Sequence, residues 1–322
     1  MPIDILISII NFRTGDLTIQ CIQSVLADIE GINGLVTVVD NLSEDGSAEQ
    51  IEAWIAEQPE GTPVRLIRSA TNSGFSGGHN QGIAAAEADY YLVLNSDAIL
   101  RPGFLRTMLD TARAHPRCGF LAPLIEYDDG GIQNSCFRFH GPMSELIRSA
   151  RAGPVTKLFQ RYDVALGPDP DPTQIRWASF ACILVNGAMV REIGPMDEGY
   201  FLYFEDVEFC LRGHRAGWDI RQERAAKAVH FRGGSGPVKT LYKQRARLPR
   251  YYYSSRTRFL YQAHGLLGVI AANLLWHLGR MIKSLYVLTG RPMGRMTKSE
   301  WRDIWINVTR PLGARFAPGD PK

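Results

Sequence analysis

The sequence contains no acidic residue between Arg224 and Ser299, and this absence divides the chain by charge. Residues 224–322 carry 19 Lys and Arg against 3 Asp and Glu, whereas residues 1–223 carry 17 against 30. The basic region favours an anionic partner. Aromatic and basic residues at 251–261 resemble a surface for stacking single-stranded bases, but the acidic remainder would repel phosphates. We therefore expect no nucleic-acid partner.

Paired cysteines are absent as well. The five cysteines are scattered without a CxxC pair, which argues against a disulfide framework or a zinc site and indicates reduced thiols in a cytoplasmic protein. No basic region precedes the apolar segment Asp4–Ile10, so we expect no secretory signal peptide. The chain has no internal repeat, and its 322 residues suffice for one large domain or two ordinary ones.

An apolar run long enough to cross a membrane is also missing. Residues 266–276 are nearly all apolar, but His277, Arg280 and Lys283 interrupt the run soon afterwards. A transmembrane helix needs about 20 apolar residues in succession. The stretch therefore indicates one or two helices lying at an anionic membrane surface. The alternative is a buried C-terminal helix whose basic residues face water.

The first hundred residues do contain a regular alternation of strand and helix patterns. The predicted strands are Ile5–Ile10, Leu35–Val39, Val64–Ile67 and Tyr90–Leu94, and the predicted helices are Leu17–Ile29, Ala48–Glu57 and Gly78–Ala86. This alternation is typical of βαβ units. We therefore expect an α/β fold in which a mainly parallel, Rossmann-like sheet is flanked by helices.

The later part of the chain is less regular. A helix from Pro102 to about His115 and a strand at Gly119–Pro123 are expected, and residues 125–176 are weakly patterned. Order resumes at Trp177–Val190, a helix runs from the acidic motif to about Ala216, and VHFRGGSG (residues 229–236) closes the core.

Polar segments follow each of the first four predicted strands. These are Asn11–Gly15, Asp40–Ser47, Asn72–Gly82 and Asn95–Ala98. Ligands of open α/β sheets bind outside the carboxyl ends of the strands, where these segments meet. Asp97 there suits a hard divalent cation, Mn²⁺ or Mg²⁺, that bridges a diphosphate. A helix cap is the alternative role for Asp97.

The segments at Asp40 and Asn72 suit a nucleotide. The Asp40 carboxylate can accept a hydrogen bond from the imide N–H of uracil or thymine, and Phe12 can stack on the base. An Asx-turn and a place at the core edge are the respective alternatives. The glycines of Asn72–Gly82 allow the backbone to approach a diphosphate at a helix N-terminus. This segment lacks the GxGxxG and P-loop spacings, so it does not identify the ligand alone.

Two adjacent acids, Glu205 and Asp206, begin a helix directly after an aromatic run. Neighbours on a helix point in different directions, so one acid can face a pocket as a general base. Each carboxylate raises the pKa of the other. A solvated helix start is the alternative, and the spacing does not distinguish the two acids. His230, at the end of an apolar strand, suits a metal or phosphate contact, or else a structural role.

In combination, these segments resemble the family 2 glycosyltransferases of the GT-A fold, and most closely their rhamnosyltransferase-like bacterial branch. They span about residues 4–236 in the family's order, and Tyr251–Tyr261 resembles the aromatic and basic segment that follows the core in this branch. The matching segments are VVDNLSEDGS, NSGFSGGHNQGI, LNSDA, GPMDEGYFLYFEDVEFCLR and VHFRGGS. The resemblance implies a GT-A catalytic domain over residues 1–236 and a basic, amphipathic helical region over 237–322.

The resemblance also implies roles for individual residues. The implied donor-binding residues are Phe12, Asp40, Asn72, Gly74, Phe75, Asn80, Asn95 and Asp97. NSD stands where the family carries its DxD motif, with Asn95 replacing the first acid, and Asp97 and His230 would hold the cation. Asp206 is the expected base, Glu205 is the second candidate, and Trp177 and Gly187 are expected near the acceptor.

The implied activity is an inverting transfer of a sugar from a nucleotide diphosphate donor to a hydroxyl of a glycan or lipid-diphosphate-linked acceptor. Rhamnose from dTDP-rhamnose is the expected donor, and UDP-hexoses are the alternative. The enzyme would work in cell-surface polysaccharide synthesis, in the cytoplasm and peripheral at the inner face of the plasma membrane. The alternative function is a non-catalytic relative that binds sugar nucleotides or polysaccharide.

Overall fold

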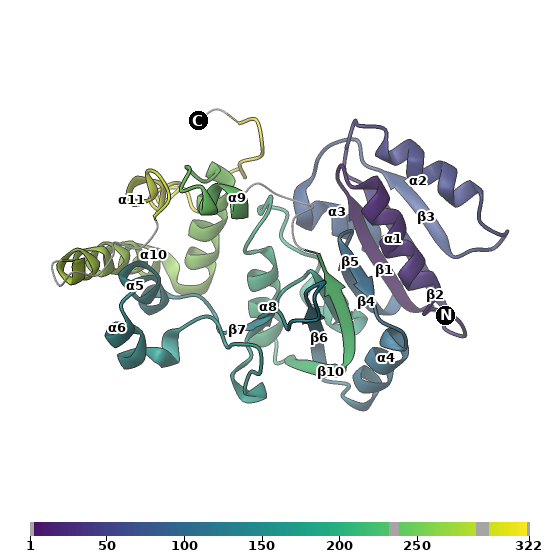
Figure 1. The fold of residues 1–322 in the computed structure, drawn as a ribbon, viewed down its shortest axis with the longest axis horizontal. Helices are drawn as coiled ribbons and strands as arrows, with labels where there is room; N and C mark the ends of the chain where they lie inside the picture. Colours follow the sequence, from purple (N-terminus) through teal and green to yellow (C-terminus); the bar gives the residue numbers. More distant parts are fainter. Residues whose placement is uncertain (1–2, 232–237, 288–295, 321–322) are drawn as a thin grey trace.

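The computed structural model describes residues 3–231, 238–287 and 296–320. An eight-stranded sheet in the order β3-β2-β1-β4-β9-β6-β10-β5 forms its centre, with helices on both faces (Figure 1). The strands are β1 (Ile3–Asn11), β2 (Gly34–Asp40), β3 (Val64–Arg68), β4 (Ala88–Asn95), β5 (Ala98–Leu100), β6 (Cys118–Glu126), β9 (Cys182–Asn186) and β10 (Asp219–His230). A separate pair contains β7 (Cys136–Phe137) and β8 (Trp177–Ala178).

The helices range in length from 4 residues in α11 to 38 residues in α10. They are α1 (Gly15–Leu26), α2 (Ser47–Ala56), α3 (Gly74–Ile83), α4 (Phe104–Ala114), α5 (Pro142–Ala150), α6 (Gly153–Leu158), α7 (Gly187–Ile193), α8 (Glu205–Arg215), α9 (Val238–Lys243), α10 (Arg250–Val287) and α11 (Glu300–Asp303). Helices α5, α6, α10 and α11 gather at one end of the molecule, far from β3 (Figure 1).

The N-terminal half agrees with the predicted pattern. β1 pairs in parallel with β2 and β4, and β2 pairs in parallel with β3. Ile5, Leu6 and Ile7 are fully buried although successive side chains of a strand point to opposite faces, because helices cover both faces of this part of the sheet, which explains the uninterrupted apolar runs. The five cysteines are all buried free thiols.

The predicted start of the third helix was wrong. α3 begins at Gly74, four residues before the expected Gly78. The glycines of this segment serve close packing on the sheet, because a Cβ at Gly78 would lie 2.7 Å from Ile10 Cδ1 and one at Gly82 would lie 2.3 Å from Ser8 Oγ. A helix that approaches a sheet this closely needs residues without side chains.

β9 interrupts the parallel order and determines which residues reach the edge. It runs antiparallel to β4, with Cys182 opposite Leu94 and Asn186 opposite Tyr90. The residues just before β9 therefore lie at the carboxyl end of β4, whereas the residues just after it lie at the amino end. β5 is antiparallel to β10 and places Ala98 opposite His230.

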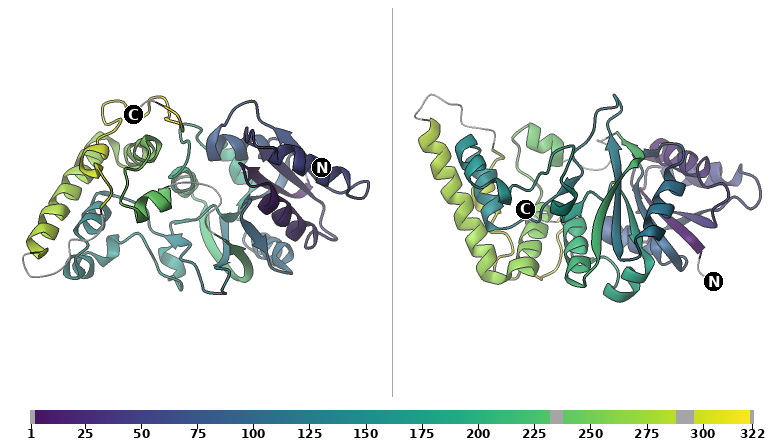
Figure 2. Two further views of the ribbon diagram at one scale, coloured as in Figure 1. Left: turned by 45° about the horizontal axis from the view of Figure 1, so that its top comes forward. Right: turned by 90° about the horizontal axis from the view of Figure 1, so that it is seen from below.

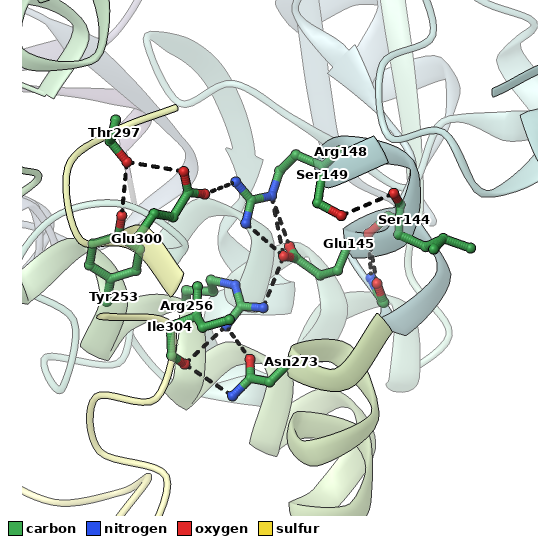
Figure 3. Close-up of polar contacts among 12 residues, drawn as sticks. Ser144, Glu145, Arg148, Ser149, Tyr253, Arg256, Asn273, Thr297, Glu300 and Ile304 are labelled. Atoms are coloured by element: carbon green, nitrogen blue, oxygen red, sulfur yellow. Dashed lines mark hydrogen bonds and ion pairs between the residues drawn. The ribbon is translucent and has the colours of Figure 1, made fainter. Parts of the chain in front are cut away.

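The weakly patterned region 125–176 contains α5, and ion pairs attach the C-terminal helices α10 and α11 to α5. Glu145 of α5 is 2% exposed and pairs with Arg148 at 2.8 Å and with Arg256 of α10 at 2.9 Å (Figure 3). Arg148 also pairs with Glu300 of α11 at 2.6 Å. We call these four side chains the Glu145 cluster. It joins three helices from distant parts of the sequence.

Hydrogen bonds complete the surroundings of this cluster. Arg256 donates to Asn273 Oδ1 at 2.9 Å, and Thr297 donates to Glu300 Oε2 at 3.0 Å (Figure 3). The arginines lower the pKa of Glu145 against the opposing effect of its burial. The predicted boundary near residues 236 and 237, including the whole RGGSG segment, lies outside the described residues. Within the described residues, α10 packs on α5 and α8 and so shares its core with the preceding part of the chain.

Replacing Glu145 with Gln is expected to lower the free energy of unfolding by about 3–5 kcal/mol, because the buried Arg256 and the partly buried Arg148 lose their shared carboxylate. Urea unfolding monitored by tryptophan fluorescence measures the change. Glu49→Gln is the control, since Glu49 forms an exposed pair with Arg68 and should matter little. Equal stability of both variants would contradict a structural role for the Glu145 cluster.

Candidate active site

Asn11, the last residue of β1, organises the edge of the sheet. Its amide nitrogen donates to Asp40 Oδ1 at 2.7 Å and to Ser47 Oγ at 2.8 Å, and its amide oxygen accepts from the backbone N–H of Thr14 at 3.2 Å. The side chain is fully buried. One amide therefore joins the segments that follow β1 and β2.

The same network reaches the segment after β4. The Thr14 hydroxyl donates to Asn11 Oδ1 at 3.2 Å and lies 3.0 Å from the hydroxyl of Ser96. Ser96 directly precedes Asp97. A continuous chain of buried hydrogen bonds thus connects Asp40 with the position next to Asp97, so the two segments hold one another in place.

Asp40 and Phe12 lie at this edge as expected. Asp40 is 6% exposed, and its carboxylate accepts from Asn11 and from the hydroxyl and backbone N–H of Ser43. This geometry includes the Asx-type turn that the sequence left open. Phe12 is half-buried, with the Arg13 guanidinium 5.2 Å from its ring centroid.

Asp97 and His230 meet, although 133 positions separate them in sequence. His230 Nε2 lies 3.2 Å from Asp97 Oδ1 and 3.5 Å from Asn95 Nδ2. The β5–β10 pairing causes this contact, and the Phe231 N–H donates to the Asp97 carbonyl at 3.0 Å. Asp97 caps no helix, because α4 begins after Gly103.

This donor set suits a divalent cation that also binds a diphosphate. A carboxylate and an imidazole are ligands that Mn²⁺ accepts, and Mg²⁺ sites commonly use one or two carboxylates with phosphates and water. Among the described residues, no group of three or more His, Cys, Asp or Glu side chains forms a complete cage. Asp97 and His230 would therefore leave several coordination positions for the donor's phosphates.

The Gly-rich helix meets a segment from the second half of the chain. The Phe75 N–H donates to the Phe201 carbonyl at 2.8 Å, and a Cβ at Gly74 would lie 2.2 Å from that oxygen. Asn72 Oδ1 accepts from Asn41 at 3.2 Å and from the Gly74 N–H at 3.1 Å. These contacts bring the start of α3 beside the residues that precede the acidic pair.

Asn80 lies in a different setting from the one expected of a donor contact. Its amide accepts from the Met196 N–H at 3.1 Å and donates to the Met196 carbonyl at 2.9 Å and to Glu198 Oε1 at 3.0 Å. It links residues 196–198, which precede the acidic pair, to α3. The described contacts of Asn80 are therefore structural.

Two residues in the left-handed region position the acidic pair. Tyr203 has φ 72° and Phe204 has φ 69°, values that residues with side chains seldom adopt. Consecutive residues of this kind occur where surrounding packing compensates the strain, often at functional sites. Phe204 stacks on Phe259 of α10 with centroids 5.8 Å apart, so α10 supports this turn. Glu205 and Asp206 follow directly and begin α8.

Burial gives both acids unusual protonation properties. It raises the pKa of Asp206 to about 7, although hydrogen bonds from the backbone of Val207 and Phe180 oppose the shift. Burial and the charge of Asp206 raise the pKa of Glu205 as well. Glu205 is 5% exposed and its Oε2 has no hydrogen-bond partner among the described residues, whereas Asp206 is partly exposed. The geometry favours a protonated Glu205 and an accessible Asp206.

The segment before β9 connects the acidic pair with the Asp97 segment. The Asn95 N–H donates to the Ala181 carbonyl at 2.9 Å, and Phe180 hydrogen-bonds Asp206 through its backbone. Arg315, near the C-terminus, donates to the Ser73 and Glu198 carbonyls at 2.8 and 3.0 Å. Residues from all parts of the chain therefore meet at one edge of the sheet.

Trp177, which the sequence predicts near the acceptor, belongs to β8, and β8 packs on α8. Trp177 stacks on Phe137 at 4.2 Å between centroids and donates from its indole to the Arg138 carbonyl at 2.8 Å. His140 lies between the two regions, 5.9 Å from the Trp177 ring and 5.1 Å from the Phe204 ring. Trp177 and His140 also line a cavity of about 320 Å³.

The expected place of Gly187 near the acceptor was wrong. A Cβ at Gly187 would lie 2.2 Å from the Ala88 carbonyl, at the amino end of β4. Asp97 follows the carboxyl end of the same strand, roughly 25 Å away along a strand of this length. Because β9 runs antiparallel, the residues after it face away from the site.

Several residues of the site carried no identifying pattern in the sequence. Asn11 was visible as the first polar residue after an apolar run, but its central position depends on partners at 40, 43 and 47. Arg315 and the strained pair Tyr203 and Phe204 gave no signal, because their roles depend on long-range packing. Asn41, which donates to the Gly74 carbonyl at 3.0 Å, was visible only as part of DNLSEDGS.

Comparisons with known proteins agree with this arrangement. A model of the family described as Glycosyl transferase family 2 matches residues 6–156. N-acetylglucosaminyl-diphospho-decaprenol L-rhamnosyltransferase of Mycobacterium tuberculosis is 30% identical over 216 residues, which cover 62% of this chain and 67% of that protein. A low-salt glycan biosynthesis hexosyltransferase of Haloferax volcanii is 25% identical over 231 residues, which cover 70% of this chain and 67% of that protein.

Solved structures resemble the chain over nearly its whole length. One is the mannosyltransferase PcManGT of Pyrobaculum calidifontis in complex with GDP-Man and Mn²⁺, with a TM-score of 0.57 at 10% identity. The matched region covers 97% of this chain and 85% of the PcManGT chain. TarS 1–349 of S. aureus has a TM-score of 0.54 at 14% identity, with coverages of 96% and 80%. These likenesses show the GT-A fold, as expected from the sequence.

Asp206→Asn is expected to flatten the dependence of stability on pH. The raised pKa means that the fold favours the protonated carboxyl, so the native protein loses stability as pH rises from about 4 through 7. The variant lacks this ionisation and should be more stable than wild type at pH 8, by about 1–3 kcal/mol.

Urea unfolding at pH 5 and pH 8 measures this difference. Asp110→Asn, on the exposed face of α4, is the control and should follow the wild-type profile. Parallel profiles for the Asp206 variant and wild type would contradict a raised Asp206 pKa.

Proposed function

The chain belongs to glycosyl transferase family 2 and to its rhamnosyltransferase-like members, and from this premise we propose the reaction that it catalyses. It is a glycosyltransferase. We propose that it transfers a sugar from a nucleotide diphosphate donor to a hydroxyl of a lipid-diphosphate-linked glycan, with inversion at the anomeric carbon. The observation that carries this proposal is that the segment before β9 connects the partly exposed Asp206, through the Phe180 backbone, with the Asp97 segment, through the Ala181 carbonyl.

The donor would occupy the edge formed by the ends of β1, β2 and β4. Asp40 and Phe12 would contact the base, and the start of α3 would offer backbone N–H groups to the phosphates. The Asn11 network supports this assignment, since it fixes the base segment relative to the Asp97 segment. Nucleotides with a uracil or thymine base suit the Asp40 carboxylate.

Asp97 and His230 would hold a divalent cation, with Asn95 beside them. Such a cation would offset the negative charge that develops on the leaving diphosphate. The protein's own contribution is to hold the carboxylate and the imidazole together in a buried site before the donor arrives. The β5–β10 pairing supports this preorganisation.

Asp206 would act as the general base. A carboxylate with a pKa near 7 is half ionised at neutral pH and remains basic enough to accept a proton. It takes the proton of the acceptor hydroxyl while that oxygen forms a bond to the anomeric carbon. The bond between the anomeric carbon and the diphosphate oxygen breaks, and the nucleoside diphosphate leaves from the opposite face. Burial favours the neutral form of Glu205, so Glu205 would add no second negative charge next to Asp206.

The relatives support the choice of substrates. The mycobacterial relative is named as an L-rhamnosyltransferase acting on a decaprenol-linked diphosphate, which supports dTDP-rhamnose as donor and a lipid-linked acceptor here. UDP-hexoses remain the alternative donors. Trp177 would contact the acceptor. Action on such a lipid would place the enzyme in the cytoplasm, peripheral at the inner face of the membrane.

Asp206→Asn is expected to lower the rate of transfer at least about a thousandfold, because an amide cannot accept the proton. Nucleotide binding, followed by thermal shift with UDP, dTDP, GDP and CDP, should stay within about twofold of wild type, since Asp206 lies on the acceptor side. Release of dTDP or UDP from the sugar nucleotide in the presence of acceptor measures turnover.

Glu205→Gln is the matched variant for the base assignment. It should retain most of the activity, because the buried acid is protonated in the native protein. Retained turnover in Asp206→Asn with loss in Glu205→Gln would transfer the role to Glu205. Nucleotide binding without turnover in wild type would instead favour a non-catalytic sugar-nucleotide-binding protein.

Asp97→Ala is expected to abolish the Mn²⁺-dependent part of donor binding. In wild type, the thermal shift produced by dTDP or UDP should increase when Mn²⁺ is added. The variant should show the same small shift with and without the cation. Asp110→Ala, at an exposed position on α4, is the control. An unchanged Mn²⁺ response in Asp97→Ala would exclude Asp97 as a ligand.

A further inference from the structure

The long helix α10 consists of two parts with different surroundings. Gly265 interrupts it with φ 68° and ψ −177°, a conformation that favours glycine. Residues 250–264 pack into the core, where Tyr253 and Phe259 are almost fully buried. Residues 266–287 run along the outer edge of the molecule, beside α5 (Figures 1 and 2). The kink therefore separates a supporting helix from a peripheral one.

The inner face of the peripheral part is fixed to α5. A Cβ at Gly279 would lie 2.1 Å from Ser149 Oγ, so the two helices approach as closely as glycine permits. Arg280 donates to the Ser149 carbonyl at 3.4 Å, and Lys283 donates to the Arg151 carbonyl at 3.5 Å. Lys283 is only 6% exposed. The basic residues that interrupt the apolar run thus face inward.

The outer face is apolar and uncharged. Five large side chains recur at intervals of 7, 4, 3 and 4 residues, which places them on one side of the helix. They are Leu267, Leu274, Leu278, Met281 and Leu285, and they are 81%, 58%, 41%, 63% and 63% exposed. We call this set the outer stripe. Exposed apolar residues gathered in this way mark an interaction site rather than an ordinary surface.

The charges at this end of the molecule are positive. Lys157 and Arg161 are exposed near α6, and Arg302 and Arg310 are exposed near α11. The acids of the same end, Glu145, Glu300 and Asp303, are all buried and paired with arginines. In the described parts of residues 146–162 and 250–310, no carboxylate is exposed.

Tryptophans accompany the stripe. Trp301 is 59% exposed, and Trp305 is 37% exposed and donates to His277 of α10 at 3.2 Å. Leu158 at the end of α6 is 75% exposed. Amphipathic Trp rings prefer the boundary between lipid chains and headgroups. The end of the molecule therefore combines an apolar stripe, interfacial aromatic residues and exposed cations.

We propose that the outer stripe inserts into the headgroup boundary of an anionic phospholipid bilayer, with α10 lying in the plane of the membrane. The proposal rests on the proposed function only in that a lipid-linked acceptor would require this location. Charge complementarity selects this partner, since the stripe is surrounded by exposed cations and no exposed carboxylate. The apolar contact supplies the affinity, and the flanking cations supply the preference for anionic lipid.

The contacts of α10 with the rest of the protein argue against a role of this helix as a membrane span. By length and composition α10 is the one helix of the described chain that meets the requirements of a membrane span. Its inner face, however, carries Asn273, Arg280 and Lys283 in contact with α5 and the segment after α11. Withdrawal of α10 from these partners would leave polar groups unpaired in hydrocarbon.

The test is flotation of the full chain with vesicles of phosphatidylglycerol and phosphatidylcholine. Wild type should float, and a triple variant, Leu274→Gln, Leu278→Gln and Met281→Gln, should bind at least about tenfold more weakly. Ile132→Gln, at another exposed apolar position, is the control and should bind like wild type. Lys157→Ala with Arg302→Ala should reduce the preference for anionic over neutral vesicles by about fivefold per residue.

Two outcomes would overturn the proposal. Wild-type flotation that the triple variant retains would exclude the outer stripe as the contact. Absence of flotation in wild type, with a dimer in light scattering that the triple variant converts to a monomer, would assign the stripe to a second copy of the chain. The thermal shift produced by dTDP or UDP is measured on the same proteins. Because the donor edge lies far from the stripe, nucleotide binding should be equal in wild type and the triple variant, and its loss in wild type would count against the proposed function and not against the outer stripe.

Discussion

The buried pairing of Glu145 with two arginines is the interaction on which the rest of the structure depends. It attaches α10 to α5, and Arg148 extends the attachment to α11 through Glu300. Once α10 is held, Phe259 supports Phe204, and Arg258 pairs with Asp197 at 3.0 Å. Both contacts stabilise the segment that precedes the acidic pair. The same attachment turns the outer stripe toward solvent, so one buried cluster orients both the site and the peripheral face.

The active-site edge is preorganised at the expense of stability. The buried carboxyl group of Glu205, whose Oε2 has no hydrogen-bond partner among the described residues, lies next to the partly exposed Asp206, and two residues before them adopt left-handed conformations. Each feature would be unfavourable on its own. Contacts with α3, α10 and the segment before β9 compensate for them. The arrangement is useful because a carboxylate with a raised pKa is a better proton acceptor at neutral pH.

In the basic C-terminal region, the number of cations in the sequence does not tell how many of them are exposed in the structure. The charge count indicated cations available for an anionic surface, but Arg256 and Lys283 are buried, and Arg258 and Arg247 pair with Asp197 and Asp303. These cations maintain the fold. The exposed cations come partly from α6, in the region without a clear pattern. The membrane-facing surface that we propose is therefore an apolar stripe with a small number of flanking charges, and not a basic tail.

The sequence by itself determined the strands and helices of the N-terminal half, because apolar periodicity reports burial directly. It also determined the segments after the strands that carry Asp40 and Asp97, since in a parallel sheet the strand ends share one edge. The acidic pair and His230 were visible as candidates in the sequence itself, and the roles that the resemblance implies for them stay predictions. Tertiary structure alone decided the place of Gly187, which depends on the direction of β9, and the roles of Asn11, Asn80 and Arg315. It also decided which acid is accessible, because exposure of Glu205 and Asp206 depends on packing by residues distant in the chain.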